Sequence, residues 1–302
     1  MLLAVLAAPA RSAPPANEGE VAVVDDYAIE RGFIKTMGEL ADKQATLHGL
    51  KNIRQRLQEV AGKTVKVAAV AAAPGSPAAA ERGVLILGSI GKRKEGGGWQ
   101  LTGTASAWAI SADGLIVTNH HAVAMEDDEE EEVFLGAMDR KGHVLAIKEI
   151  VADDKDADIA VLRVDAREFP LHPLPMARRV PAAGTPVGVI SHPDGCYYCL
   201  SLGHVTRHHR QPVADGDVEK ALKGEKVPMV TKMSISADFG VGSSGAPVLD
   251  GQGRVVGMVC QTSTVVATGS EKEAENPPAD GVQMVFKDCV PLPALRAVIG
   301  AR

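Results

Sequence analysis

The chain has 302 residues and a mass of 31.5 kDa, enough for one or two domains with a sizeable core. Apolar residues make up 45% of it and charged residues 23%, proportions of an ordinary globular protein that exclude a disordered chain, a collagen or a coiled-coil fibre. The 38 Asp and Glu residues outnumber the 32 Lys and Arg residues, and the net charge of −6 argues against a protein that binds nucleic acid by neutralising its phosphates.

The first ten residues, MLLAVLAAPA, favour a signal peptide for export to the periplasm or the cell exterior. They are apolar, and Ala8-Pro9-Ala10 has the small-residue pattern of a cleavage site. The apolar stretch is short, however, and no basic residue precedes it, so an apolar tail on a cytoplasmic protein is the alternative. The sequence predicts no membrane-spanning helix, because it has no run of about 18 uninterrupted apolar residues.

Three segments precede the expected main domain. Residues 11–24 are rich in Pro, Ala and Glu and indicate a leader. Within residues 25–60, apolar side chains recur at three- and four-residue intervals with charges between them, which predicts an amphipathic helix. That helix packs on the main domain or, as a short coiled coil, joins copies of the chain into a homo-oligomer, and the repeat is too short to decide between these. Residues 61–82 contain small residues and prolines and indicate a linker.

From residue 83 onward, short β-branched segments alternate with turns that contain Gly, Asp or Pro. Examples of these segments are GVLILGSI, DIAVLRV and RVVGMVC. Many short strands at this spacing predict a mainly β fold, either a sandwich or a barrel. Near the C-terminus, residues 292–299 have the pattern of a helix.

Three motifs contain the side chains that acyl transfer needs. His121 follows an apolar strand in SADGLIVTNHHAV, Asp158 opens the strand DIAVLRV, and Ser244 lies in the turn GVGSSGAPVLD. A serine hydroxyl becomes nucleophilic when a histidine accepts its proton, and a carboxylate holds that histidine in one tautomer. The N–H groups of Gly242 and Ser244 are candidates for an oxyanion hole. The chain order His, Asp, Ser excludes α/β-hydrolases and subtilisins and leaves the order found in chymotrypsin.

These motifs resemble those of trypsin-like serine peptidases, and in particular the bacterial HtrA/Deg branch. DGLIVTNHHAV resembles a DGYILTNNHVV-type segment, DADIAVLRV a TDLAVLKV-type segment, and GSSGAP the GNSGGP or GDSGGP turn. The resemblance covers residues 83–302 and implies a chymotrypsin-like double antiparallel β-barrel, with barrels at about 83–167 and 185–289 and the candidate triad His121, Asp158 and Ser244 between them. It implies a serine endopeptidase that acts on polypeptides and needs no cofactor and no metal.

The sequence departs from the branch at several points. Ala246 replaces a glycine of the GGP turn, and Ala107 stands where the family usually has glycine, so both are expected to narrow the access of substrate to the cleft. The chain ends at Arg302, directly after the second expected barrel, so no PDZ domain is expected. A peptidase-like module that binds peptides without turnover, oligomerised by the helix over 25–60, is therefore the alternative function.

Four residues are candidates for the substrate pocket. Asp238 lies six residues before Ser244, at the position that forms the base of the S1 pocket in the chymotrypsin fold, where a carboxylate favours Lys or Arg in the substrate. Alternatively, the loop turns Asp238 away and Phe239 fills the pocket. By the resemblance, Val259 and Cys260 lie on the strand beside the substrate. The alternative for Cys260 is a buried thiol packed near Asp158.

Other residues with reactive side chains carry weaker signals. Cys196 and Cys199 form a C-x-x-C pair that a third hypothesis assigns to thiol redox chemistry, but no βαβ context surrounds it. The histidines around Arg207 indicate an exposed basic hairpin rather than a metal site. The acidic run Glu126–Glu132 indicates a solvated loop. His120 is expected to point away from His121, because neighbours on a strand alternate faces.

Overall fold

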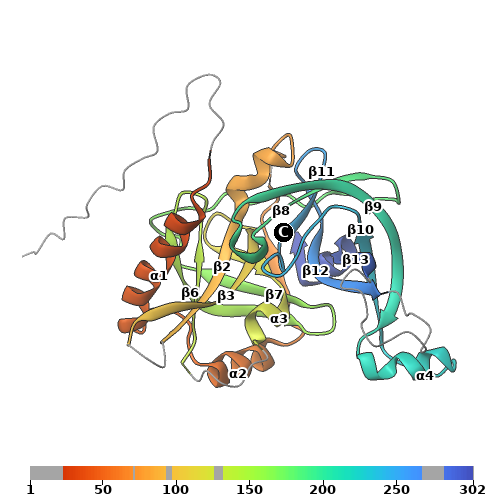
Figure 1. Cartoon of the computed structure of the whole chain (residues 1–302), viewed down its shortest axis with the longest axis horizontal. Helices are drawn as coiled ribbons and strands as arrows, with labels where there is room; N and C mark the ends of the chain where they lie inside the picture. The colour runs from red at the N-terminus through yellow and green to blue at the C-terminus, as the bar shows by residue number, and fades with distance from the viewer. Residues whose placement is uncertain (1–22, 71, 93–96, 126–131, 267–281, 302) are drawn as a thin grey trace, which may run out of the picture.

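The computed structural model describes residues 23–70, 72–92, 97–125, 132–266 and 282–301. Within these residues, two six-stranded antiparallel β-barrels lie side by side and helices precede the first of them (Figure 1). The predicted mainly β, double-barrel fold is therefore confirmed. The signal peptide expected at 1–10, almost all of the leader and nearly all of the acidic run lie outside the described residues. None of the described helices is long and apolar enough to cross a membrane.

The first barrel closes through pairing of its first and fourth strands, β2 and β5. Its spatial order is β2-β3-β4-β7-β6-β5, and aliphatic side chains such as Leu87, Ile116 and Leu162 fill the interior. The strands are β2 (Val84–Lys92), β3 (Trp99–Ala109), β4 (Leu115–Thr118), β5 (Phe134–Met138), β6 (Val144–Asp154) and β7 (Ile159–Val164).

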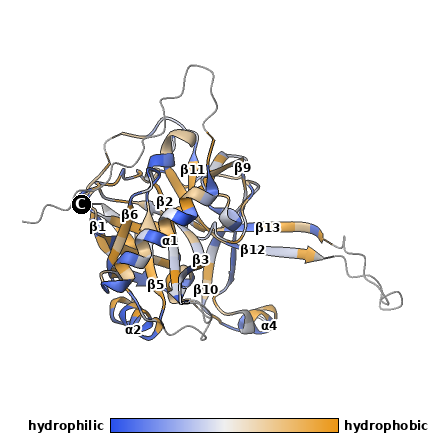
Figure 2. Ribbon diagram, turned by 60° about the vertical axis from the view of Figure 1, so that its left-hand side comes forward, coloured by the Kyte–Doolittle hydropathy of each residue, from blue (hydrophilic) through white to orange (hydrophobic). Residues whose placement is uncertain are grey.

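The second barrel has the order β10-β13-β12-β11-β8-β9 and closes through β9 and β10. Its core contains Val189, Met233 and Val248. Two of its strands, β12 and β13, run on beyond the barrel as a two-stranded ribbon (Figure 2). The strands are β8 (Pro186–Ser191), β9 (Cys199–Pro212), β10 (Met229–Ile235), β11 (Pro247–Asp250), β12 (Val255–Val266) and β13 (Val282–Pro291).

The prediction of one helix over 25–60 is wrong in one respect, because two helices occupy that range. They are α1 (Asp26–Asp42) and α2 (Leu50–Val60). Between them the chain follows the edge of the first barrel, where the Leu47 N–H donates to Ile147 O at 2.8 Å and Leu47 O accepts from Leu135 N–H at 2.9 Å. The first helix ends before Leu47, where Gln44 has a φ of 49° and the N–H groups of Gln44 and Ala45 donate back to Ala41 O and Leu40 O.

The apolar faces of both helices pack on the first barrel, as one of the two alternatives predicted. Met37 of α1 and Ile53 of α2 are fully buried. Glycines in the barrel wall permit the close approach of α1, because a Cβ at Gly88 would lie 2.6 Å from the Phe33 ring and a Cβ at Gly136 would overlap Met37. The apolar stripe that a coiled coil would need is thus buried within this chain.

The expected linker over 61–82 contains a short strand and a 3-10 helix. That strand, β1, pairs in parallel with β14 near the C-terminus, so the linker is fastened to the end of the chain. The remaining short elements are β1 (Val65–Val67), η1 (Ala78–Gly83), α3 (His120–Ala124), η2 (Pro193–Gly195), η3 (Asp215–Asp217), α4 (Val218–Leu222), α5 (Leu292–Val298) and β14 (Ile299–Ala301).

Candidate active site

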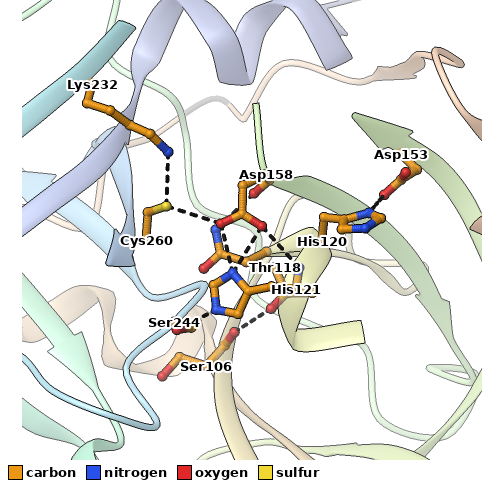
Figure 3. Close-up of polar contacts among 10 residues, drawn as sticks. Ser106, Thr118, His120, His121, Asp153, Asp158, Lys232, Ser244 and Cys260 are labelled. Carbon is orange, nitrogen blue, oxygen red and sulfur yellow. Dashed lines mark hydrogen bonds and ion pairs between the residues drawn. The ribbon is translucent and has the colours of Figure 1, made fainter. Parts of the chain in front are cut away.

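The structure brings His121, Asp158 and Ser244 together where the two barrels meet (Figure 3). His121 lies at the start of α3 directly after β4, Asp158 directly before β7, and Ser244 in the turn before β11. His121 Nε2 is 2.9 Å from Ser244 Oγ, and His121 Nδ1 is 2.8 Å from Asp158 Oδ2. The histidine and the carboxylate therefore come from the first barrel and the hydroxyl from the second.

The local backbone fixes Asp158 in one orientation. Its φ of 62° is unusual for a residue other than glycine, and Asn119 Nδ2 donates to its carbonyl oxygen at 2.9 Å. Its carboxylate also accepts a hydrogen bond from the backbone N–H of His121 at 3.0 Å. Burial raises the pKa of this carboxyl, but the hydrogen bonds and charge of His121 outweigh burial and hold the pKa below its ordinary value.

The ionised carboxylate determines the tautomer of His121. A carboxylate accepts hydrogen bonds and cannot donate them, so Nδ1 of the neutral imidazole must carry the proton that faces Asp158. Nε2 then has a free lone pair, which lies within hydrogen-bond reach of the Ser244 hydroxyl. The arrangement can accept a proton from Ser244 Oγ.

The turn around Gly242 holds two peptide groups in fixed directions. Val241 O accepts from Asp194 N–H at 2.8 Å, and Ser243 O accepts from Ala246 N–H at 3.0 Å. Because a trans peptide points its N–H opposite to its C=O, these bonds also fix the N–H groups of Gly242 and Ser244. No hydrogen bond from either N–H to another group is found within the described part of the chain.

The first barrel also supports the serine turn directly, through residues that the sequence did not single out. Ser106 on β3 donates from its N–H to Ser244 O at 2.8 Å and from its hydroxyl to Gly242 O at 3.0 Å. Thr118 Oγ1 donates to Ser106 O at 2.8 Å. Ser106, Thr118 and Asp194 stand in ordinary strand or turn sequence, so their roles depend on which segments the fold brings together and leave no local signal.

A cavity of about 910 Å³ adjoins the site. His121, Gly242 and Ser244 line one end of it, and it continues along β2 and β3 to Leu50 of α2. The expectation that two alanines narrow this space is wrong. Ala107 and Ala246 are fully buried in the two barrel cores and do not line the cavity.

Asp238 does not form the base of a pocket. Its side chain is 87% exposed and pairs with Lys287 Nζ at 2.8 Å, which lowers the pKa of its carboxyl. The alternative, in which the loop turns Asp238 away, is the one observed. Phe239 is buried in the core of the second barrel, beneath the Lys287 ammonium.

The expectation that Val259 contributes to the substrate pocket is also wrong. Its side chain is buried, its N–H donates to Ala246 O at 2.9 Å, and its carbonyl accepts from Gly245 N–H at 3.2 Å. Cys260 is a buried thiol packed near Asp158, which is the alternative given for it above. Its Sγ lies 3.1 Å from Asp158 Oδ2.

The other candidates lie away from this site. His120 points away from His121 and contacts Asp153 at 2.7 Å, but the reason is the rotation of helix α3 rather than the alternation of a strand. All four cysteines are free thiols, and those of the C-x-x-C pair are exposed. Among the described residues, no cluster of His, Cys, Asp and Glu side chains could hold a metal.

Two closed barrels with a His, Asp and Ser group between them define a chymotrypsin-like fold, and comparison with known proteins agrees. Residues 105–258, about half of the chain, match the family model of the trypsin-like peptidase domain. The chain belongs to the trypsin-like peptidase family.

The curated relatives include members of the HtrA/Deg branch, as the motifs predict. The chain is 34% identical over 163 residues to a probable periplasmic serine endoprotease DegP-like of Hahella chejuensis, which covers 53% of this chain and 30% of the relative. It is 27% identical over 161 residues to Protease Do-like 1, chloroplastic, of Arabidopsis thaliana, covering 52% and 32%. It is 30% identical over 156 residues to Serine protease HTRA2, mitochondrial, of Bos taurus, covering 51% and 30%. The matched segment thus spans about a third of the length of these relatives.

Proposed function

We propose that the protein is a serine endopeptidase that hydrolyses peptide bonds in polypeptides. The observation that supports this most strongly is the hydrogen-bonded series from Asp158 through His121 to Ser244, with distances of 2.8 Å and 2.9 Å. Relatives of this chain are named as serine endoproteases, which is consistent with that chemistry.

In the proposed mechanism Ser244 Oγ attacks the carbonyl carbon of the scissile peptide. His121 Nε2 takes the hydroxyl proton, and Asp158 stabilises the imidazolium that results. The N–H groups of Gly242 and Ser244 donate to the oxyanion of the tetrahedral intermediate. His121 then protonates the leaving amine, and a water molecule repeats the sequence on the acyl-enzyme to release the second product. No step requires a cofactor.

We also propose the division of the chain and its destination. The peptidase unit comprises residues 83–302, and α1 and α2 are fastened to its first barrel through Met37 and Ile53. Residues 1–10 would serve as an export signal, which agrees with the periplasmic relatives. The substrates would then be polypeptides outside the cytoplasm.

Hydrolysis of an unfolded polypeptide tests this function. Wild-type protein is incubated with reduced casein, and new N-termini are counted for wild type, Ser244→Ala and Ser263→Ala. Ser263 lies exposed on the ribbon of β12 and β13, so its variant controls for the loss of a hydroxyl elsewhere. We expect cleavage by wild type and Ser263→Ala, with Ser244→Ala reduced by about 10⁶-fold. Binding of casein by a folded wild type that releases no new termini would support the peptide-binding alternative instead.

A further inference from the structure

A buried lysine lies behind the candidate triad, on the side of Asp158 that faces away from Ser244 (Figure 3). Lys232 is on β10 and is 4% exposed, and its Nζ lies 3.1 Å from Cys260 Sγ. In the described part of the chain it forms no ion pair with a carboxylate. Because burying an ammonium is costly, the polar contact between Lys232 and the Cys260 thiol calls for an explanation.

The thiol of Cys260 connects that ammonium to the carboxylate of Asp158. Cys260 is 6% exposed, and its Sγ is 3.1 Å from Lys232 Nζ on one side and 3.1 Å from Asp158 Oδ2 on the other. Burial and the charge of Asp158 raise the pKa of the thiol to about 12, although Lys232 opposes this, so the thiol keeps its proton at neutral pH.

The donors and acceptors of the three groups permit one direction of hydrogen bonding. An ammonium has donors and no acceptor, so Lys232 donates to a lone pair of the sulfur. The thiol has a single proton, and the carboxylate of Asp158 is its acceptor. The series therefore runs in one direction, from Lys232 through Cys260 to Asp158.

The other titratable groups near this series do not take the place of Lys232 as the donor to the Cys260 thiol. Cys289, on β13, interacts electrostatically with Cys260, with Lys232 and with its neighbour Asp288. The Asp288 carboxylate accepts from Ser234 Oγ at 2.6 Å and faces His209 at 3.8 Å. Cys289 is fully buried and its thiol pKa is raised well above its ordinary value, so it stays neutral.

We propose that Lys232 and Cys260 are positioning residues for the candidate triad. Lys232 orients the Cys260 thiol toward Asp158, and the thiol fixes the carboxylate at Oδ2, the oxygen that also lies nearest to His121 Nδ1. This inference rests on the proposed function, since it explains how the orientation of His121 is maintained. Neither residue touches the reacting atoms.

The first test compares Lys232→Met with Lys63→Met, a control that removes an exposed lysine after α2. We expect kcat of Lys232→Met to fall about tenfold with KM within about twofold, because a bond to a charged group is lost. The acid limb of kcat/KM against pH should move to higher pH, because removing a nearby cation raises the pKa of the His121 imidazole. Lys63→Met should match wild type in both measurements.

The second test uses Cys260→Ser and Cys260→Ala, which keep and remove the donor to Asp158. We expect Cys260→Ser to retain kcat within about threefold and Cys260→Ala to lose about tenfold. The His121 pKa, measured by ¹⁵N NMR of the ring, should rise in Cys260→Ala and Lys232→Met and stay unchanged in Cys260→Ser. This variant pair also tests the inference should Lys232→Met fail to fold.

The outcomes separate this inference from the proposed function. Active wild type with unchanged kcat and His121 pKa in folded Lys232→Met would overturn the positioning role and leave the function intact. Equal losses in Cys260→Ser and Cys260→Ala would also overturn it. Inactive wild type would overturn the function, whereas the NMR measurement would still decide whether Lys232 and Cys260 act on His121 through Asp158.

Discussion

At the scale of single residues, the Asp158 carboxylate is the acceptor that connects the groups of the candidate site. Its carboxylate is shared among the His121 ring, the His121 backbone N–H and the Cys260 thiol. These contacts keep it ionised and select the tautomer of His121 that leaves Nε2 free. A neutral side chain of the same size would keep the shape of the site and lose this selection.

Asp158→Asn should therefore abolish most activity without unfolding the protein. The asparagine amide can donate to Nδ1 and so favours the wrong tautomer, and we expect kcat/KM to fall about 10⁴-fold. Steady-state hydrolysis of a peptide substrate measures the loss, and circular dichroism checks the fold. A decrease of less than about tenfold would show that Asp158 does not set the state of His121.

The three motif residues could be predicted from the sequence, but the residues that support them could not. His121, Asp158 and Ser244 each lie in a short segment whose neighbours carry the signal, such as TNHH or GSSGAP. Ser106 and Lys232 act on these residues from other strands, across separations that no local pattern reveals. The sequence left two orientations of Asp238 open for the same reason, because its partner Lys287 comes from a distant strand.

At the scale of elements, the turn before β11 requires glycine at position 242. Gly242 has a φ of 87°, and a Cβ there would overlap the backbone oxygen of His192. Relief of that overlap would displace the 241–242 peptide, whose carbonyl accepts from Asp194 N–H. The orientation of one proposed oxyanion donor is therefore tied to the absence of a side chain.

Gly242→Ala should reduce kcat by about 10²–10³-fold, the cost of losing one oxyanion donor. Gly251→Ala is the matched control, since a Cβ at that turn would meet open space. Measurement of kcat for both variants gives the comparison. Similar activity in Gly242→Ala and Gly251→Ala would exclude the Gly242 N–H from the oxyanion hole.

Helix α1 is connected to the same turn through the segment between β8 and β9. Asp26, in the first turn of α1, accepts from Tyr197 N–H at 3.0 Å, and the Asp194 N–H of that segment donates to Val241 O. Asp26→Ala should thus lower kcat about three- to tenfold, the effect of one lost hydrogen bond. Asp42→Ala, at the opposite end of the helix, should leave kcat unchanged. Equal kcat in both variants would remove α1 from the support of the turn.

The break between α1 and α2 shows where a periodic sequence misleads. The apolar spacing over 25–60 continues through the break, so it predicts one helix. The helix ends where Gln44 adopts a φ of 49°, Leu47 then bonds to β5 and β6, and Gly49, with a φ of 78°, allows the chain to turn into α2. The bonds of Leu47 exist only once the barrel has formed, so no local pattern reveals them.

At the scale of the whole molecule, the candidate site lies where the two barrels meet, and helix α1 packs on the first of them. Ser106 of the first barrel donates hydrogen bonds to the serine turn of the second, and apolar side chains of α1 pack on the first barrel. The turn spacing alone predicts a mainly β fold, and the double barrel could be predicted because the three motifs resemble those of trypsin-like peptidases. The burial of β2 on both faces could not be predicted, because it follows from the packing of α1 against the barrel.

Met37→Ala should show that α1 is an integral part of this fold. The side chain is fully buried against Gly136, so its removal leaves a cavity and should cost about 2–5 kcal/mol of unfolding free energy. Urea unfolding measures the loss, with the exposed Glu39→Ala on the same helix as control. An unchanged unfolding midpoint would mean that α1 is not part of the cooperative unit.

The most direct measurement of the central claim is covalent labelling by a fluorophosphonate. This reagent reacts with a serine that a neighbouring base has activated, and mass spectrometry with peptide mapping locates the adduct. The account predicts one adduct per chain on Ser244, present in Ser263→Ala and absent in Ser244→Ala. A folded wild type that takes up no label, or takes it up on another residue, would contradict it.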